Sequence, residues 1–451
     1  MSSTSLDPTT LAQQLATAYT QPTQTLLDTQ TKAAQAQSTG LTSLQSALNA
    51  FKTALNALAS KPGQSVTQYS ATASESGYFT ATTTSSAQPI STPLYVEQVA
   101  TTHQIAYQDL PAVPAGPGSM SVSFGNGTNL SVDLASADTD GDGTLSQAEI
   151  ARAINTSAAG QVTAMVVTVG GSTQLMLTSG SSGDGGKITS VTSTVAALNT
   201  VLTDPTKKKE LVAAQDAIVW LGAQGTGTRL QQASNTVTAI AGVSITLTKA
   251  QTAGASPLTL TVARDDTATT AKLQNFIDAY NKLETSLDSL TAVSTNGSTA
   301  GAFANDSGVR ALKDSLANLL RKDYGSSNLR TLGVSIDRAG QLSVDSSKLT
   351  KALTANSLAL NDVLGSAALS APSGLLGASS QLLDRWTNST SGQIKQRQDS
   401  VQSQQKSIAD RQTKLQAQYT SAYNRYLLQF TQLQQLQTQM SQTSSIFSSL
   451  S

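Results

Sequence analysis

Hydrophobic residues near the start of the chain recur with the spacing of a coiled-coil helix. Between residues 41 and 58 they alternate at intervals of three and four positions: Leu41, Leu44, Leu48, Phe51, Leu55 and Leu58. This spacing is that of the apolar seam of a coiled coil. Leu27 and Ala34 extend the pattern backwards, Gly40 is expected to interrupt it, and Pro62-Gly63 is expected to end the helix.

Two sets of residues near the C-terminus each repeat every seven positions. The first set is Ile394, Val401, Ile408, Leu415 and Ala422, and the second is Tyr419, Tyr426, Leu433, Met440 and Phe447. A third segment shows the seam again, at Leu273, Phe276, Tyr280, Leu283, Leu287 and Leu290. A helix with so narrow an apolar stripe cannot bury it alone, so these helices must pair with one another or with another molecule.

The polar faces of the C-terminal helix are rich in Gln, Ser, Thr and Asn instead of Glu and Lys. Gln398, Gln405 and Gln412 even occupy positions of the seam. Two interpretations remain open. The terminal helices form an ordinary helical bundle, or they are partly disordered in the free protein and become ordered on assembly.

The middle of the chain changes to an alternating pattern of apolar and polar residues. From about residue 76 to 265, short strands such as 120–124, 162–169, 243–247 and 258–262 are predicted, with a helix at 146–155 among them. A hairpin at 333–344 interrupts the later helices. The sequence therefore predicts an α+β fold, with helical leg domains formed by both termini and an inserted β-rich head of two small subdomains.

The composition excludes several kinds of chemistry. The 451 residues contain no Cys and a single His, His103, so disulfides, thiol nucleophiles and multi-His metal sites are excluded. Lys plus Arg and Asp plus Glu are both 28, which argues against a nucleic-acid binder. No apolar stretch is long enough to insert into a membrane, and no basic, apolar N-terminal signal is present. An enzymatic function is not expected.

The motif at 138–149 matches the twelve-residue calcium loop. Asp138, Asp140, Asp142, Thr144 and Glu149 stand at ligand positions, with a Gly at the sharp turn. A second interpretation needs no metal, because Ser146 and Glu149 form the pattern of a capping box for the helix that follows. Structural calcium and a capped turn both remain open.

Several segments, taken in order, resemble the flagellar hook-associated protein 2 family, the filament cap proteins. The helix 273–283 is similar to the family signature, as are 235–247, the hairpin 332–345 and the tail 426–433 with Met440 and Ser444-Ser445. The element 145–155 resembles one shared by hook-associated proteins. The resemblance covers nearly the whole chain, although the glycine-rich opening of the family is reduced to residues 4–7 and Gln434 replaces a usual Glu.

The resemblance implies a cap at the distal end of the bacterial flagellar filament. Such a protein leaves the cell through the flagellar export channel and stays extracellular. It assembles as a homo-oligomeric ring, expected to be a pentamer. It promotes flagellin polymerisation and prevents exported flagellin from leaking. The implied partners are a second copy of the chain, flagellin, the export apparatus and its chaperone.

The combined interpretation divides the chain into legs and head. We expect a terminal leg segment at 1–40, disordered alone, and a leg helix at 41–75. A lower head subdomain is expected at 76–112 and 205–265, and an upper one at 113–204. A helical leg domain at 266–390 and a coiled-coil leg helix at 391–451 complete the chain.

The leg helix is expected to make the flagellin contacts through its apolar side chains. They are Tyr419, Tyr426, Phe430, Leu433, Met440 and Phe447. The faces rich in Gln would then permit release, because no strong ion pairs would hold one register. The alternative function is a surface adhesin whose β-rich head binds host glycans or mucin; paired terminal helices favour the cap.

Overall fold

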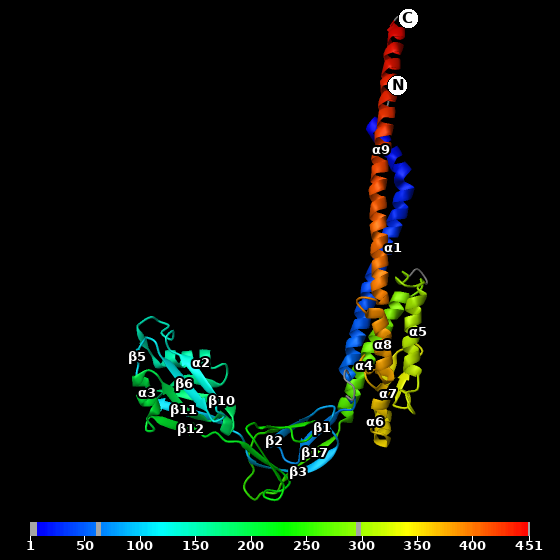
Figure 1. The fold of residues 1–451 in the computed structure, drawn as a ribbon. Coiled ribbons are helices and arrows are strands. Elements are labelled where there is room, and N and C mark those ends of the chain that lie inside the picture. The colour runs from blue at the N-terminus through cyan, green and yellow to red at the C-terminus, as the bar shows by residue number, and fades with distance from the viewer. Residues whose placement is uncertain (1–6, 60–64, 295–298, 450–451) are drawn as a thin grey trace. The chain divides into compact units, whose positions relative to one another are not determined.

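The chain divides into two compact units, one helical and one rich in strands (Figure 1). The computed structural model describes residues 7–59, 65–294 and 299–449. The helical unit comprises Met1–Val66 and Thr269–Ser451, and the β-rich unit comprises Thr67–Ala268. This division confirms the predicted α+β class, with helices at both termini and a β-rich insertion.

The helical unit joins two very long terminal helices to several shorter ones. Its helices are α1 (Pro8–Ala59), α4 (Asp266–Thr291), α5 (Ser307–Arg321), α6 (Ser346–Ala355), α7 (Ala359–Leu364), α8 (Gly374–Thr387) and α9 (Gln393–Ser449). A hairpin of β18 (Val334–Ile336) and β19 (Leu342–Val344) lies between α5 and α6. Among the described residues, none of the helices combines the length and apolarity needed to cross a lipid bilayer.

The core of the helical unit forms where α1 and α4 pack together. All the seam residues named above for 41–58 and 273–283 are buried in one cluster, together with side chains of α5 to α9. Phe51 lies at its centre, with ring centroids 5.7 Å from Phe276 and 5.9 Å from Tyr280. The narrow stripes are therefore buried by packing helices from the two ends of the chain on each other.

The helices α1 and α9 pair in opposite directions over much of their length. Gln398 donates to Gln45 at 3.0 Å, and Gln412 donates to Thr31 at 3.3 Å. Leu27 and Ala34 pack with Ile408 and Leu415 in a small buried cluster.

Gly40 does not interrupt α1, which is continuous from Pro8 to Ala59. A Cβ atom on Gly40 would lie 2.7 Å from the Cβ of Ala302 and 3.1 Å from the ring of Phe303. The glycine therefore allows the loop before α5 to approach the helix closely. Its sequence signal marks a packing contact and not a helix end.

The first part of the β-rich unit consists of two antiparallel sheets around one core. The larger has the order β1 (Tyr69–Ala73), β17 (Leu258–Arg264), β3 (Ile90–Gln98), β13 (Ala217–Leu221) and β14 (Thr228–Gln232). The smaller has the order β15 (Thr236–Val237), β16 (Val243–Leu247) and β2 (Phe79–Thr83). Their inward residues, such as Leu94, Val219 and Leu260, form the core.

The second part has its own core between two further sheets and two helices. One sheet has the order β12 (Lys208–Val212), β4 (Thr102–Gln108), β10 (Ser172–Ser182) and β9 (Val162–Val169). The other has the order β11 (Ile188–Ser193), β6 (Ser119–Phe124) and β7 (Asn129–Asp133). The remaining elements are α2 (Gln147–Ser157), α3 (Ala196–Thr203), the short 3₁₀ helix η1 (Asp184–Gly186), and the pair β5 (Val113–Pro114) and β8 (Thr144–Leu145).

The boundaries of the head parts differ from the predicted ones. Strands β4 and β12 pair with each other and β4 pairs with β10, so residues 102–108 and 208–212 belong to the upper core and not the lower one. The predicted leg helix 41–75 is also too long, because α1 ends at Ala59 and β1 begins at Tyr69. For the head boundary, each strand joins the sheet that supplies its partner, and no local pattern reveals that partner.

Candidate functional site

The last part of α9 presents the side chains predicted to contact a partner. Tyr419, Tyr426 and Phe430 are partly buried. Leu433 is 45% exposed and Met440 is 65% exposed. The side chain of Phe447 lies outside the described residues. The role of these residues in binding stays a prediction.

The sequence interpretation missed further apolar side chains on this surface. Leu436 is 53% exposed and lies three positions after Leu433 and four before Met440, so the three share one face of the helix. Leu428 and Ile446 are exposed as well. Leu436 continues the seven-residue series of Ile394 to Ala422, but Gln429 interrupts that series before it reaches Leu436.

The exposure of Leu436 and Met440 follows from the pairing of α9 with α1. The hydrogen bonds of Gln45 and Thr31 fix the antiparallel register. Extended along both helices, this register places the described start of α1, Pro8, opposite Gln435. Figure 1 shows the red end of α9 continuing past the blue start of α1. From Leu436 onward, the seam has no helix of the described chain to cover it.

A second exposed stripe runs along the first half of α1. Leu15, Tyr19 and Leu26 are exposed, and their spacing of four and seven places them on one side of the helix. We define the leg surface as Leu15, Tyr19, Leu26, Leu433, Leu436 and Met440. Exposed large apolar side chains that share a stripe are typical of a surface that another protein covers.

The contacts between α1 and α9 are hydrogen bonds and apolar contacts. The hydrogen bonds between them join Gln, Thr and Arg side chains, and within the described part of the chain no ion pair connects the two helices. Charged flanking residues are the usual means by which a coiled coil fixes one register and one partner. Over its described residues, the helix pair therefore has no ion pair that would fix its register or its partner.

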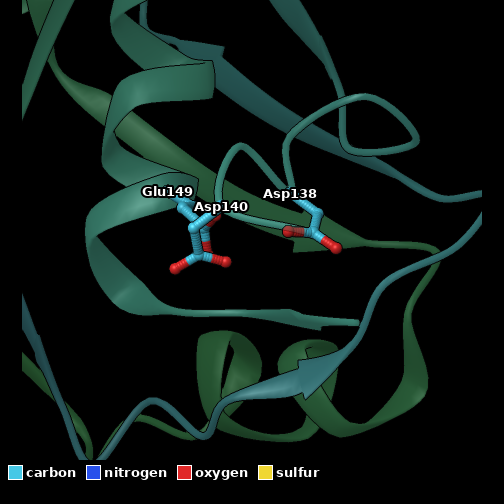
Figure 2. A group of neighbouring side chains, drawn as sticks. All are labelled: Asp138, Asp140 and Glu149. Carbon is cyan, nitrogen blue, oxygen red and sulfur yellow. The ribbon is translucent and has the colours of Figure 1, made fainter. Parts of the chain in front are cut away.

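The acidic loop before α2 brings three carboxylates together (Figure 2). Ligand oxygens of Asp138, Asp140 and Glu149 all lie within 4.8 Å of one another. Asp142 is not part of this group; its carboxylate instead accepts the N–H of Thr144 at 2.7 Å. Of the five residues predicted as calcium ligands, the structure brings Asp138, Asp140 and Glu149 together, and calcium binding by them stays a prediction.

The capping box predicted for α2 is present. Glu149 accepts from the N–H of Ser146 at 2.9 Å and from the N–H of Thr139 at 2.8 Å, while the Ser146 hydroxyl accepts from the N–H of Glu149. The hydrogen bonds from the Ser146 and Thr139 backbone lower the pKa of Glu149 to about 2. Glu149 is thus an ionised, nearly buried carboxylate held by backbone donors.

The same loop fits a calcium ion only in part. Oxygen ligands of Asp138, Asp140 and Glu149 are of the kind that calcium prefers, at a mutual distance that one ion can span. Both oxygens of Asp138 also accept backbone N–H groups, from Gly141 at 2.8 Å and Gly143 at 3.1 Å. These bonds satisfy the carboxylates internally, so the loop can be held in its shape by protein donors.

His103 is a buried structural residue. Its Nδ1 accepts the N–H of Ile188 at 2.9 Å, and its Nε2 lies 2.9 Å from a carboxylate oxygen of Glu210. The ring thus ties β4 to β11 and β12. With both nitrogens engaged inside the sheet packing, His103 has a clear structural role.

Comparison with known proteins relates nearly the whole chain to one family. A family model described as the flagellar hook-associated protein 2 C-terminus matches residues 214–442, and a model of the N-terminus matches residues 4–103. A lateral flagellar hook-associated protein 2 of Vibrio parahaemolyticus is 37% identical over 449 residues, covering 98% of this chain and 99% of the relative. A flagellar hook-associated protein 2 of Salmonella typhimurium is 30% identical over 323 residues, covering 67% of this chain and 66% of the relative.

A solved structure is similar to this chain as well. The crystal structure of the D1-D2-D3 domains of the flagellar cap protein FliD from Escherichia coli has a TM-score of 0.64 and 26% sequence identity. The match covers 80% of this chain and 99% of the Escherichia coli chain. These relatives lend no support to the adhesin alternative.

Proposed function

The chain belongs to the flagellar hook-associated protein 2 family, and from this premise we propose that it is the non-enzymatic cap at the distal end of the bacterial flagellar filament. As a cap it promotes the polymerisation of flagellin and prevents the leakage of exported monomers. The observation that carries the proposal is the 37% identity over 98% of the chain, which includes both terminal helices and the β-rich unit. The cap is needed for filament elongation and motility.

The leg surface is the part that meets flagellin. Its apolar side chains are exposed on two long helices, and from Leu436 onward the seam of α9 is open along the described chain. The polar faces around it contain Gln and Thr in place of charge pairs. Contacts of this kind hold a partner through burial of apolar area, and they can shift without breaking ion pairs.

The cap works as an assembly outside the cell. We assign it a homo-oligomeric ring, with five subunits as the expected number, at the filament tip. The chain reaches the tip through the flagellar export channel with the help of the export apparatus and a chaperone. A chain without Cys can be carried unfolded through such a channel with no disulfide to open.

The test of the leg surface uses substitutions that leave the fold intact. Leu433, Leu436 and Met440 are exposed, so their joint replacement by Gln should leave the melting temperature of the full chain unchanged. In cells that lack the native protein, this variant should be exported yet fail to support filament growth. A matched control replaces Gln432, Gln437 and Gln439 by Ser and should support growth.

A truncation gives a second test of the same proposal. Ending the chain after residue 415 removes the exposed part of α9 and should leave the β-rich unit folded while abolishing capping. Filament growth of normal length with the truncated chain, or with the triple Gln variant, would contradict the assignment of the leg surface.

For the acidic loop we propose a structural calcium site formed by Asp138, Asp140 and Glu149. The support is the approach of their oxygens to within 4.8 Å and the match of the loop to the calcium pattern. Calorimetry of the full chain with calcium should give a saturable heat that Asp138→Asn removes, and thermal unfolding should shift upward. No heat and no shift would leave the capping box as the whole explanation of the loop.

A further inference from the structure

A groove opens in the helical unit between the end of α5 and the hairpin β18–β19. Its volume is about 530 Å³, and it is lined by Leu320, Arg321, Asn328, Leu329, Arg330 and residues 334–336. Leu320 and Leu329 are buried and give it an apolar base. The groove therefore combines an apolar base with a charged rim.

Two arginines stand on the rim, and the nearby carboxylate of Asp323 accepts a hydrogen bond from Asn328 at 2.8 Å. Arg321 and Arg330 are both exposed, and in the described portion of the chain neither forms an ion pair with an acid. Only 12% of the chain is charged, so two free guanidinium groups at one groove stand out. A guanidinium presents a planar fork of N–H donors that fits a carboxylate.

The outer edge of β19 is closed by a side chain. The N–H of Leu342 donates to Oδ1 of Asn281 at 2.7 Å, and Nδ2 of Asn281 donates to the carbonyl of Leu342 at 2.9 Å. The amide of Asn281 thus takes the place of a neighbouring strand. No further strand can add on this side of the hairpin.

The outer edge of β18 is open at Ile336, whereas the N–H of Val334 donates to the carbonyl of Leu329 at 2.9 Å. The bonds from Asp345 N–H to the Gly333 carbonyl and from Asp337 N–H to the Gln341 carbonyl direct alternate residues of β18 toward β19. Ile336 therefore points its N–H and carbonyl away from β19. Across residues 7–59, 65–294 and 299–449, no hydrogen bond to either group is present. Ile336 also lines the groove, so this free edge borders it.

We propose that the groove binds an extended segment of a partner protein that carries Asp or Glu side chains among β-branched residues. The segment pairs its backbone with β18 beside Ile336 and directs its carboxylates to Arg321 and Arg330. Its apolar side chains cover Leu329. The free N–H and carbonyl of Ile336, an apolar base and two guanidinium groups without an ion pair in the described chain together select this occupant. Strand addition supplies affinity and side-chain pockets supply specificity.

This inference is independent of the proposed cap function. It rests on a surface formed by α5 and the hairpin, away from the leg surface on α1 and α9. The groove would bind such a segment whether or not the chain caps a filament.

Fluorescence polarisation of the full chain with a labelled synthetic peptide tests the proposal. The probe is acetyl-Ser-Val-Asp-Val-Asp-Val-Thr-Ser-amide. It should bind saturably, and Arg321→Gln or Arg330→Gln should each weaken binding about tenfold, as expected for the loss of one charge-assisted contact. The matched control is Arg385→Gln, an exposed arginine of the same unit outside the groove, which should leave binding unchanged.

Two altered peptides separate the charge contribution from the strand contribution. Replacing both Asp by Lys should abolish binding, and methylating the backbone nitrogens of the central Val residues should weaken it, because methylation removes strand hydrogen bonds. The proposal is overturned if no saturable binding occurs, if both groove variants bind as the native chain does, or if the Lys and N-methyl peptides bind equally well. It is also overturned if the peptide does not bind and the groove variants instead abolish self-association, since the occupant would then be a second copy.

Discussion

Asp306 joins three helices of the helical unit, so its replacement should destabilise that unit measurably. As the N-cap of α5, its carboxylate accepts the N–H of Gly308 at 2.9 Å and of Val309 at 3.0 Å. The same carboxylate pairs with both terminal nitrogens of Arg397 on α9, at 2.5 and 3.1 Å. The Arg397 guanidinium lies 5.2 Å from the ring centroid of Trp386 on α8.

The expected loss of unfolding free energy is the sum of two separable contributions. Loss of an N-cap side chain costs about 1 kcal/mol. Loss of a partly buried, two-point ion pair costs about 1 kcal/mol, at the upper end for exposed pairs. Asp306→Ala removes both contributions and should lower the free energy of unfolding by about 2 kcal/mol. Asp306→Asn keeps a capping oxygen and should cost about half as much.

The contribution of Asp306 should also depend on pH in a defined direction. Burial raises the pKa of its carboxyl, but the hydrogen bonds from Arg397 and from the Val309 and Gly308 N–H groups outweigh burial and hold the pKa below its ordinary value of 3.8. A group whose pKa is lower in the folded state stabilises the fold above its unfolded pKa. This stability is lost as pH falls through the folded pKa, so the native chain should approach the Asn variant there.

Thermal unfolding of the full chain, followed by far-ultraviolet circular dichroism, measures these changes. For a unit of this size 1 kcal/mol corresponds to about 2–4 °C, so Asp306→Ala should lower the helical transition by about 4–8 °C. The control is Asp399→Asn, which breaks an exposed pair with Lys395 within α9 and should shift it little. The reasoning is refuted if Ala and Asn at position 306 unfold together, or if neither shifts the transition.

Three further substitutions test other contacts by thermal unfolding. Gly40→Ala should destabilise the helical unit despite a gain of about 1 kcal/mol in helix propensity, because its Cβ would lie too close to Ala302 and the ring of Phe303. A stabilised variant would show that the loop carrying Ala302 and Phe303 moves aside at little cost. His103→Phe should cost about 1–3 kcal/mol by leaving the buried N–H of Ile188 without an acceptor, and an unchanged melting temperature would argue against that bond. As pH falls from 4.5 toward about 2, the Glu149→Gln variant should lose less stability than the native chain, because the pKa of the Glu149 carboxyl is lowered in the folded state. Equal acid sensitivity of the two chains would contradict a contribution of Glu149 to the pH dependence.

Helical seams were predictable from local spacing. A helix repeats every 3.6 residues, so residues such as Leu41, Leu48 and Leu55 mark a buried stripe without knowledge of the partner. The capping box at Ser146 and Glu149 is local as well, because both partners lie within one helical turn. Such features depend on neighbours in the sequence, and the structure contains them where the pattern indicates.

Strand partners and helix register were decided only by the tertiary structure. Strand β4 pairs with β10 and β12, which are distant in sequence, and this choice moves the boundary between the two head cores. An alternating pattern marks which face of a strand is buried but leaves its neighbour open. Gly40 carries the same ambiguity, since a glycine signal fits a helix end and a close contact equally well, and only the position of Phe303 distinguishes them.

The leg surface and the groove likewise depend partly on local sequence and partly on tertiary structure. The apolar character of Leu436 and Met440 is visible in the sequence, yet their exposure depends on where the described part of α1 begins opposite α9. The groove beside Arg321 and Arg330 has no local signature, because Asn281, which lies on α4, closes one hairpin edge and the other edge is free, within the described chain, only at Ile336. Short-range spacing thus determines which side chains share a face, while long-range packing decides which of those faces stay uncovered.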